Sequence, residues 1–260
     1  EIMKGCDNFC SYCIVPYARG KSRSMPEDLV LEKLHEFKAA GRKEVVFTGI
    51  HLGVYGKDFN PGKSLPELLL KIRKLKLIER LRLSSIEPCE LSDDIIELAV
   101  NWNGLCQHFH ISLQSGDDII LRRMKRPYDS AFFRELVLKI KDRLPNAAIG
   151  VDVLSGFPGE SQQAFENTVD LIKSLPVSYL HVFPFSPREG TPAYNFSGQV
   201  PSAVIKERCR ILRELSESLR NRFYNAFDGK TIEVLVEEKR ERVSGLLKGI
   251  SRNYIPVVFD

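Results

Sequence analysis

The chain has 260 residues, of which 43% are hydrophobic and 28% charged, and its formal net charge is +4. This composition provides enough apolar material for one large α/β domain or for a domain with an appendage. No apolar run approaches the roughly 20 residues of a membrane-spanning helix, so no membrane partner is expected. The mildly basic charge is compatible with an RNA substrate but does not by itself indicate one.

The six cysteines do not have the pattern of a disulfide framework. Three fall within one short stretch near the start of the chain, at the spacing Cys-x3-Cys-x2-Cys: Cys6, Cys10 and Cys13. The other three stand among apolar residues and are predicted to be buried thiols: Cys89, Cys106 and Cys209. Reduced thiols favour a cytoplasmic protein.

The clustered cysteines can give an iron–sulfur cluster three ligands but no fourth. The next His and Cys in the chain, His35 and Cys89, are too distant to belong to the same loop. Electron-transfer clusters usually close all four positions with cysteine, whereas catalytic metal sites keep one position open. A zinc loop, which normally needs a fourth Cys or His nearby, and three unrelated thiols are the alternatives. The spacing and the adjacent Tyr12 favour a [4Fe–4S] cluster with one open iron.

Extended and helical patterns alternate along most of the chain. Strands are expected before Cys6 and at 44–48, 81–83, 108–113, 149–154 and 179–183, and helices at 26–40, 65–75, 92–100, 129–143 and from 161 onward. Six successive β-then-α units imply a parallel sheet with right-handed crossovers. Six units are too few for the usual eight-unit barrel, so an open, partial barrel is predicted.

The pattern changes after residue 228. A long amphipathic helix is expected at 202–227, followed by strands at 231–236 and 243–250 around a charged turn. We therefore predict a boundary near Gly229, with one domain at 1–228 and a β segment at 229–260.

The cysteine segment resembles two nested families. Cys6, Cys10, Tyr12 and Cys13 resemble the signature of radical S-adenosylmethionine (SAM) enzymes, in which the open iron chelates the cofactor's methionine part. The longer run Gly5-Cys6-x3-Cys10-x-Tyr12-Cys13-Ile14-Val15-Pro16-x2-Arg19-Gly20-x2-Arg23-Ser24 resembles the methylthiotransferases, which modify tRNA or a ribosomal protein. The resemblance implies a partial TIM-like (βα)6 barrel, bound SAM, and SAM cleavage to a 5′-deoxyadenosyl radical that abstracts a substrate hydrogen.

Ligands of parallel α/β folds bind at the carboxyl ends of the strands, so the loops there carry the candidate cofactor site. Backbone around Gly49 is expected to meet the cofactor's amino group, and the side chains of Gln114 and Ser115 are expected to reach its ribose hydroxyls. The expected cofactor contacts are, in chain order, Tyr12, Thr48, Gly49, Ser85, Glu87, Gln114, Ser115, Asp152, Val182 and Phe183. His51 is interpreted as an ordinary loop histidine.

Basic residues give the candidate substrate contacts. Arg19 and Arg23 are expected to hold an anion, either the cofactor carboxylate or an RNA phosphate. A basic loop is expected to touch the phosphates of a tRNA anticodon arm, although a solvated surface would also explain it: Arg122, Arg123, Lys125 and Arg126.

The motifs further resemble the branch that acts on N6-threonylcarbamoyladenosine in tRNA, through runs such as His181-Val182-Phe183-Pro184. The isopentenyladenosine and ribosomal-protein branches, and a non-catalytic iron–sulfur or RNA-binding module, are the alternatives. The final stretch resembles the opening of a TRAM domain, a small RNA-binding β-barrel that about thirty residues cannot close.

Family members also carry an amino-terminal domain with a second [4Fe–4S] cluster, which this chain lacks. We therefore expect the chain to be the central piece of a longer, monomeric protein. A one-electron reductant such as flavodoxin or ferredoxin is its expected partner.

Overall fold

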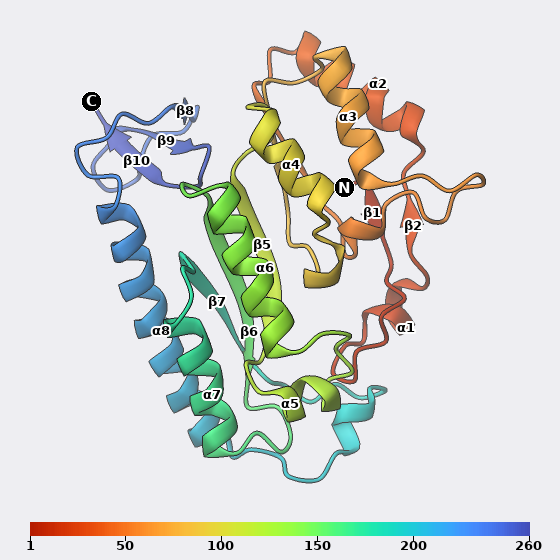
Figure 1. Ribbon diagram of the computed structural model, residues 1–260, viewed down its shortest axis with the longest axis vertical. Coiled ribbons are helices and arrows are strands. Elements are labelled where there is room, and N and C mark those ends of the chain that lie inside the picture. The colour runs from red at the N-terminus through yellow and green to blue at the C-terminus, as the bar shows by residue number, and fades with distance from the viewer.

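The computed structural model describes residues 1–260 and consists of an open α/β layer with a small antiparallel sheet at one end (Figure 1). The parallel strands are β1 (Met3–Lys4), β3 (Glu44–Phe47), β4 (Arg80–Leu83), β5 (His108–Gln114), β6 (Ala148–Ser155) and β7 (Tyr179–Pro184). The main helices are α1 (Val15–Arg19), α2 (Glu27–Ala39), α3 (Leu65–Leu75), α4 (Asp93–Asn101), α5 (Asp118–Arg123), α6 (Ser130–Arg143), α7 (Gln162–Lys173) and α8 (Ser202–Asn225).

The parallel strands do not form one continuous ladder. β3 pairs with β4, and β5, β6 and β7 pair in that order. Single parallel bridges join the pieces, at Met3–Gly49 between β1 and the end of β3 and at Ile86–Ile111 between the β4 and β5 regions. The result is an open, curved sheet in the order β1-β3-β4-β5-β6-β7, so the predicted α/β class and open arrangement are confirmed.

Helix ends follow local signals in the sequence. Ser64 and Glu67 form a capping box at the start of α3, with Pro66 in its first turn, and α3 has the predicted bounds. The side chains of Asp117, Asp129 and Ser161 accept backbone N–H groups at the starts of α5, α6 and α7. None of the helices combines the length and the apolar character that crossing a membrane requires.

The two faces of the curved sheet differ in polarity. On β5, Phe109, Ile111 and Leu113 pack into the main apolar core beneath the helices. The alternate residues His108 and His110 point to the concave side, where they meet Tyr179 of β7. The concave side, here called the lumen, is therefore lined by polar and aromatic groups.

The C-terminal segment differs in part from the prediction. Strands β8 (Val234–Val236) and β9 (Leu247–Ser251) are shorter or shifted relative to the predicted ranges, and a third strand, β10 (Pro256–Phe259), was not predicted. The three form an antiparallel sheet in the order β10-β9-β8. The division into two domains and the TRAM likeness stay predictions.

The C-terminal sheet packs against the amino-terminal ends of the parallel strands. Arg82 on β4 donates to the carbonyls of Ser251 (3.1 Å) and Arg252 (3.2 Å), and Arg80 donates to that of Ile250 (3.0 Å). Figure 1 shows this sheet beside the carboxyl end of α8, at the opposite end of the molecule from α5. The end of the lumen at the carboxyl ends of the strands is thus left to the cysteine segment.

Candidate iron–sulfur and cofactor site

The three clustered cysteines lie in one tightly folded loop between β1 and α1. Gly5 has a φ of +71°, and a Cβ there would lie 2.0 Å from the carbonyl oxygen of Lys21, so only glycine fits. The Cys6 amide donates to the carbonyl of Gly20 (3.1 Å), and the Cys13 amide to that of Cys10 (3.0 Å). The loop is held in shape by its own backbone.

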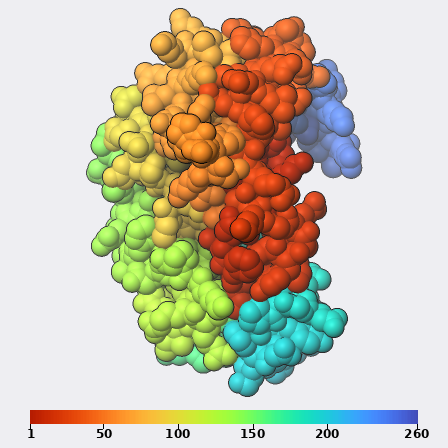
Figure 2. Space-filling model, turned by 90° about the vertical axis from the view of Figure 1, so that its right-hand side faces the viewer, coloured from red at the N-terminus to blue at the C-terminus, as the bar shows by residue number.

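The middle of the loop is anchored to distant parts of the chain. Ser11 is buried; its hydroxyl donates to the carbonyl of Arg123 (2.8 Å) and its amide to that of Met124 (3.1 Å). The Ala193 amide donates to the Ser11 carbonyl (2.8 Å). In Figure 2 the amino-terminal segment (red) borders both the yellow-green surface and the cyan surface around residue 190.

The surroundings favour thiolate at the first cysteine. Burial opposes ionisation of Cys6, but hydrogen bonds from His51 and from the Asn8 amide outweigh it and lower its pKa. At Cys13, burial raises the pKa of the thiol, and the other two cysteines add to this rise by repulsion. Thiolates are the form that binds iron, so a bound cation would offset this repulsion.

His51 is part of the site, contrary to the prediction of an ordinary loop histidine. It is buried and forms a short hydrogen bond with Glu90, and its Nε2 lies 3.1 Å from Asn8 Nδ2. Burial would lower its pKa, but the hydrogen bonds with Cys6 and Glu90 raise the pKa of His51 to about 9. The same pairing thus lowers the pKa of Cys6 and raises that of His51.

Arg126 also belongs to the cysteine site, and its predicted role as a phosphate contact is wrong. Its side chain is only 2% exposed and forms an ion pair with Glu87. Its Nη1 donates to Cys10 Sγ (3.2 Å) and its Nε to the Tyr128 hydroxyl (2.8 Å). The guanidinium therefore supports the second cysteine, and Glu87 is occupied in holding it there.

The other predicted anion contacts remain on the surface. Arg122, Arg123 and Lys125 are exposed at the end of α5. Arg19 and Arg23 are exposed beside the cysteine loop, where Arg23 donates to the Arg19 carbonyl (3.2 Å). None of these five residues forms an ion pair.

Most of the predicted cofactor residues are at least partly exposed at the strand ends. Those that present a partly or fully exposed group at the carboxyl ends of the strands are Tyr12, Thr48, Gly49, Ser85, Gln114 and Phe183. Gly49 also allows close approach of β1, because a Cβ there would lie 2.6 Å from Met3 Cβ.

Two further candidates point elsewhere. Ser115 is buried, and its hydroxyl lies 3.3 Å from that of Thr168 on α7 and accepts from the Asp117 amide (3.2 Å). The Val182 side chain packs against the main apolar core. The ribose contact expected of the Ser115 hydroxyl is therefore wrong, whereas Val182 is partly exposed and its cofactor contact stays a prediction.

Asp152 lies deeper in the lumen, between two imidazoles. His110 Nε2 is 2.6 Å and His181 Nδ1 is 3.6 Å from Asp152 Oδ1. Burial would raise the pKa of Asp152, but the two histidines lower it to about 2. One atom of each residue lies within 4.8 Å of the others, so the set can bind a cation or a polar substrate group. The alternation of polar residues along β5 indicated the face on which His110 lies, but Asp152 and His181 belong to β6 and β7, and no local pattern joins the three.

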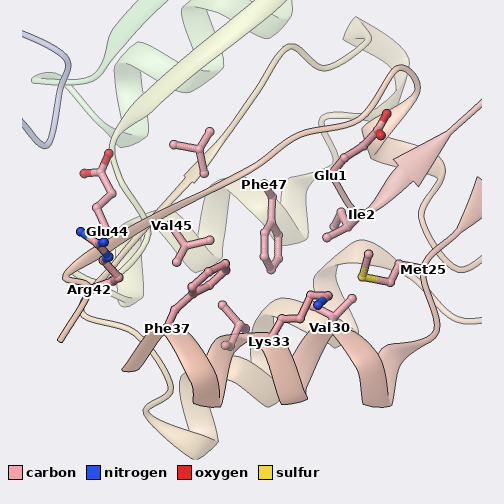
Figure 3. Close-up of a pocket in the computed structure, with 12 residues that line it drawn as sticks. Glu1, Ile2, Met25, Val30, Lys33, Phe37, Arg42, Glu44, Val45 and Phe47 are labelled. Carbon is pink, nitrogen blue, oxygen red and sulfur yellow. The ribbon is translucent and has the colours of Figure 1, made fainter. Parts of the chain in front are cut away.

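A separate cavity lies outside the lumen. It measures about 450 Å³ and is formed between α2 and β3. Figure 3 shows Val30, Lys33 and Phe37 of α2 directed toward Val45 and Phe47. This cavity is mainly apolar and contains none of the cysteine-site residues.

The donor set fits an iron–sulfur cluster with bound SAM. The three thiols share one loop without disulfides, and the loop carries cationic support at Cys6 and Cys10. Of the other three cysteines, Cys106 and Cys209 are buried as predicted, but Cys89 is exposed, so that prediction is wrong. Gln114 and Phe183 lie at the same end of the strands and leave polar and aromatic groups for a nucleoside.

Comparison with known proteins agrees with this site. The family model for the radical SAM superfamily matches residues 1–172. The chain is 39% identical over 264 residues to the threonylcarbamoyladenosine tRNA methylthiotransferase MtaB of Bacillus subtilis, covering 100% of this chain and 58% of that protein. It is 37% identical over 259 residues to the tRNA-2-methylthio-N(6)-dimethylallyladenosine synthase of Acetivibrio thermocellus, covering 100% and 54%. The chain thus spans somewhat more than half of these relatives.

Solved structures support the fold. The radical SAM methyltransferase TsrM of Kitasatospora setae matches with a TM-score of 0.62 at 18% identity, over 74% of this chain and 37% of that one. Methylornithine synthase (PylB) matches with a TM-score of 0.52 at 15% identity, over 84% and 66%. With the family match over residues 1–172 and the three-thiol loop at Cys6, Cys10 and Cys13, the chain belongs to the radical SAM superfamily, and its relatives include the methylthiotransferases MtaB and MiaB-type synthases.

Proposed function

We propose that this chain is the radical SAM part of a tRNA methylthiotransferase that acts on N6-threonylcarbamoyladenosine next to the anticodon. The observation that carries the proposal is the loop of Cys6, Cys10 and Cys13, which offers three thiols and no fourth cysteine ligand. The relationship to MtaB over the whole chain supports the choice of tRNA. When bound, a [4Fe–4S] cluster supplies the electron for reductive cleavage of SAM.

The protein's own residues have binding and positioning roles. Cys6, Cys10 and Cys13 hold the cluster, while His51 and Arg126 stabilise negative charge on two of the sulfurs. Six residues at the strand ends would surround the cofactor: Tyr12, Thr48, Gly49, Ser85, Gln114 and Phe183. The ion pair between the buried Arg126 and Glu87 keeps the cysteine loop in place.

The polar lumen favours the threonylcarbamoyl group over an isopentenyl group. His110, Asp152 and His181 offer hydrogen-bonding groups below the cofactor end of the strands. The hydroxyl and amide groups of a threonylcarbamoyl side group can hydrogen-bond to the exposed His181 imidazole, whereas an apolar isopentenyl group would form no such bond. The isopentenyladenosine and ribosomal-protein activities are therefore the alternatives.

The whole reaction also requires parts outside this chain. A second cluster in an amino-terminal domain, a flavodoxin- or ferredoxin-like reductant and a monomeric state complete the proposal. The 58% share of MtaB that this chain spans is consistent with further domains in the complete protein.

Mass spectrometry of tRNA nucleosides tests the proposed substrate. Cells lacking the full-length gene should lose the methylthio form of threonylcarbamoyladenosine and accumulate the unmodified nucleoside. The wild-type gene should restore it, and Cys10→Ala should not. Loss of the methylthio isopentenyl nucleoside instead would select the isopentenyladenosine branch. Unchanged tRNA together with a lost methylthio group on a ribosomal protein would select the ribosomal-protein branch.

A further inference from the structure

A second cavity lies at the opposite end of the lumen from the cysteines, between α8 and the C-terminal sheet. Its volume is about 440 Å³, and residues of β6, β7, α8, β9, β10 and the turn between β9 and β10 contribute to it. Its lining is aromatic, with Tyr179, Phe223, Tyr224 and Tyr254, together with His181 and Arg220. Such a volume suits a nucleobase with its sugar rather than an extended peptide.

The cavity is lined by a positively charged side chain and by no negatively charged one. Arg220 is exposed, forms no ion pair, and lies with its guanidinium 6.0 Å from the centre of the Tyr179 ring. No carboxylate lines the cavity. A positive charge without an acidic partner beside several aromatic rings is the arrangement with which proteins bind unpaired nucleotides.

A neighbouring depression continues the positive charge on the other side of Phe223. It is lined by Lys141, Lys173 and Arg222, again without a carboxylate. Burial and the nearby Arg222 lower the pKa of Lys141 to about 8, so an anion placed there would favour the charged amine. Phe223 lines both hollows, so a strand of RNA crossing it can place a base on one side and a phosphate on the other.

Tyr254 is held in an unusual backbone conformation at the entrance. Its φ is +66°, a region that bulky residues seldom adopt. Its ring stacks on His108, with centroids 4.2 Å apart and planes at 15°, yet 40% of the residue is exposed. The Arg82 guanidinium also lies 5.0 Å from the centre of this ring, so the fold fixes the tyrosine at the surface of the cavity and a base can contact only its exposed part.

We propose that this cavity binds an unpaired nucleotide of the RNA substrate, with its base against the tyrosines and its phosphate near Arg220. The proposal rests on the proposed function in taking RNA as the substrate. It adds a contact at the other end of the lumen from the cysteines, where α8 and the C-terminal sheet meet β6 and β7. His181 lines this cavity and also faces Asp152, so the cavity adjoins the Asp152 cluster. That sheet would therefore help to position the RNA rather than only to cover the strand ends.

The test uses the full-length protein and an anticodon stem–loop RNA that carries 2-aminopurine at one unpaired position at a time. Tyr254→Leu and Arg220→Gln should each weaken binding, Tyr254→Leu by about 5- to 150-fold, the equivalent of about 1–3 kcal/mol for one stacked base. Tyr254→Phe, which keeps the ring, should bind like the wild type. Arg213→Gln removes an exposed, unpaired cation from the same helix outside the cavity and is the matched control.

The fluorescence signal separates stacking from a general loss of affinity. At one position the wild type and Tyr254→Phe should quench 2-aminopurine, whereas Tyr254→Leu, saturated with RNA, should not. If wild-type protein binds RNA and all the cavity variants behave like Arg213→Gln, the cavity assignment is overturned and the proposed function stands. If the wild type binds no RNA and binds a protein substrate instead, the tRNA assignment fails and the cavity proposal fails with it.

Discussion

Replacing Arg208 with methionine tests how the turn after β6 is held against α8. The Arg208 and Glu160 side chains are only 6% and 4% exposed, and Arg208 Nη1 donates to Glu160 Oε1 (2.7 Å) and to the Glu160 carbonyl (3.0 Å). Glu160 in turn accepts the Gly156 amide (2.9 Å). The Arg208 Nε has no partner, so the pair is incompletely satisfied.

The structure predicts a large loss of stability from the single change. Removing one member of a buried ion pair leaves an uncompensated charge and costs about 3–5 kcal/mol. Solvent does not screen this pair, so the estimate needs no large reduction. Arg208→Met with Glu160→Gln should recover most of the loss, because the amide oxygen can still accept from Gly156 while no charge is buried.

The pH dependence of the loss identifies its cause. Burial already raises the pKa of Glu160 in spite of Arg208, and removing the cation should raise it further above the ordinary value of 4.5. The folded variant then binds a proton that the unfolded chain lacks, so its stability increases as the pH falls between those two pKa values. The gain is at most about 1.4 kcal/mol per pH unit.

Urea unfolding at pH 7.5 and at pH 5.5 measures both effects. Arg210→Met is the matched control, because Arg210 pairs with Glu207 and Glu214 on the exposed face of the same helix and such pairs contribute about 0–1 kcal/mol. An Arg208→Met loss below about 1 kcal/mol, or an equal loss at both pH values, would refute the reasoning.

Two further predictions concern the basic loop and the lumen. Changing Arg122, Arg123 and Lys125 to alanine in the full-length protein should weaken tRNA binding by a similar factor for every sequence. The slope of log affinity against log salt should become shallower by close to one unit for each true phosphate contact removed. Unchanged affinity and slope would mean that the loop is ordinary surface. Burial, then the charges of Arg82, His110 and His181, lower the pKa of His108 well below 6.5. As the pH drops through 6.5, His108 is therefore protonated in the unfolded chain but not in the folded one, so the free energy of unfolding should decrease. The decrease should be less steep in His108→Phe. Identical pH profiles of the two proteins in urea unfolding would contradict this.

The sequence predicted those features that depend on neighbouring residues. The bounds of α3 were predicted because the Ser64–Glu67 capping box and Pro66 act within one turn. The cysteine loop was predicted for the same reason, since its three thiols are close in sequence. The alternation that places the β strands is likewise local.

Features that depend on distant partners were missed. Arg126 stands among three exposed cations, and its burial depends on Glu87 and Cys10, which are 39 and 116 residues away. His51 is likewise fixed by Glu90, 39 residues further along. Neither contact has a signal in the surrounding sequence.

Ser115 was misplaced for a different reason. The pairing of β5 with β6 shifts register between Ser112 and Gln114, and Gln114 has a φ of +67°. Simple alternation therefore fails at the strand end, and the Ser115 side chain turns toward α7 instead of the cofactor.

If Cys6, Cys10 and Cys13 hold a cluster with an iron open to SAM, anaerobic reconstitution followed by reaction with SAM and dithionite will show it. The wild-type chain should gain iron and visible absorption and should release 5′-deoxyadenosine. Cys209→Ala, which removes a buried thiol elsewhere, should do the same, whereas Cys10→Ala should lose most of the iron and form no product above background. Full iron retention in Cys10→Ala, or a fully loaded wild type that leaves SAM intact, would contradict the account.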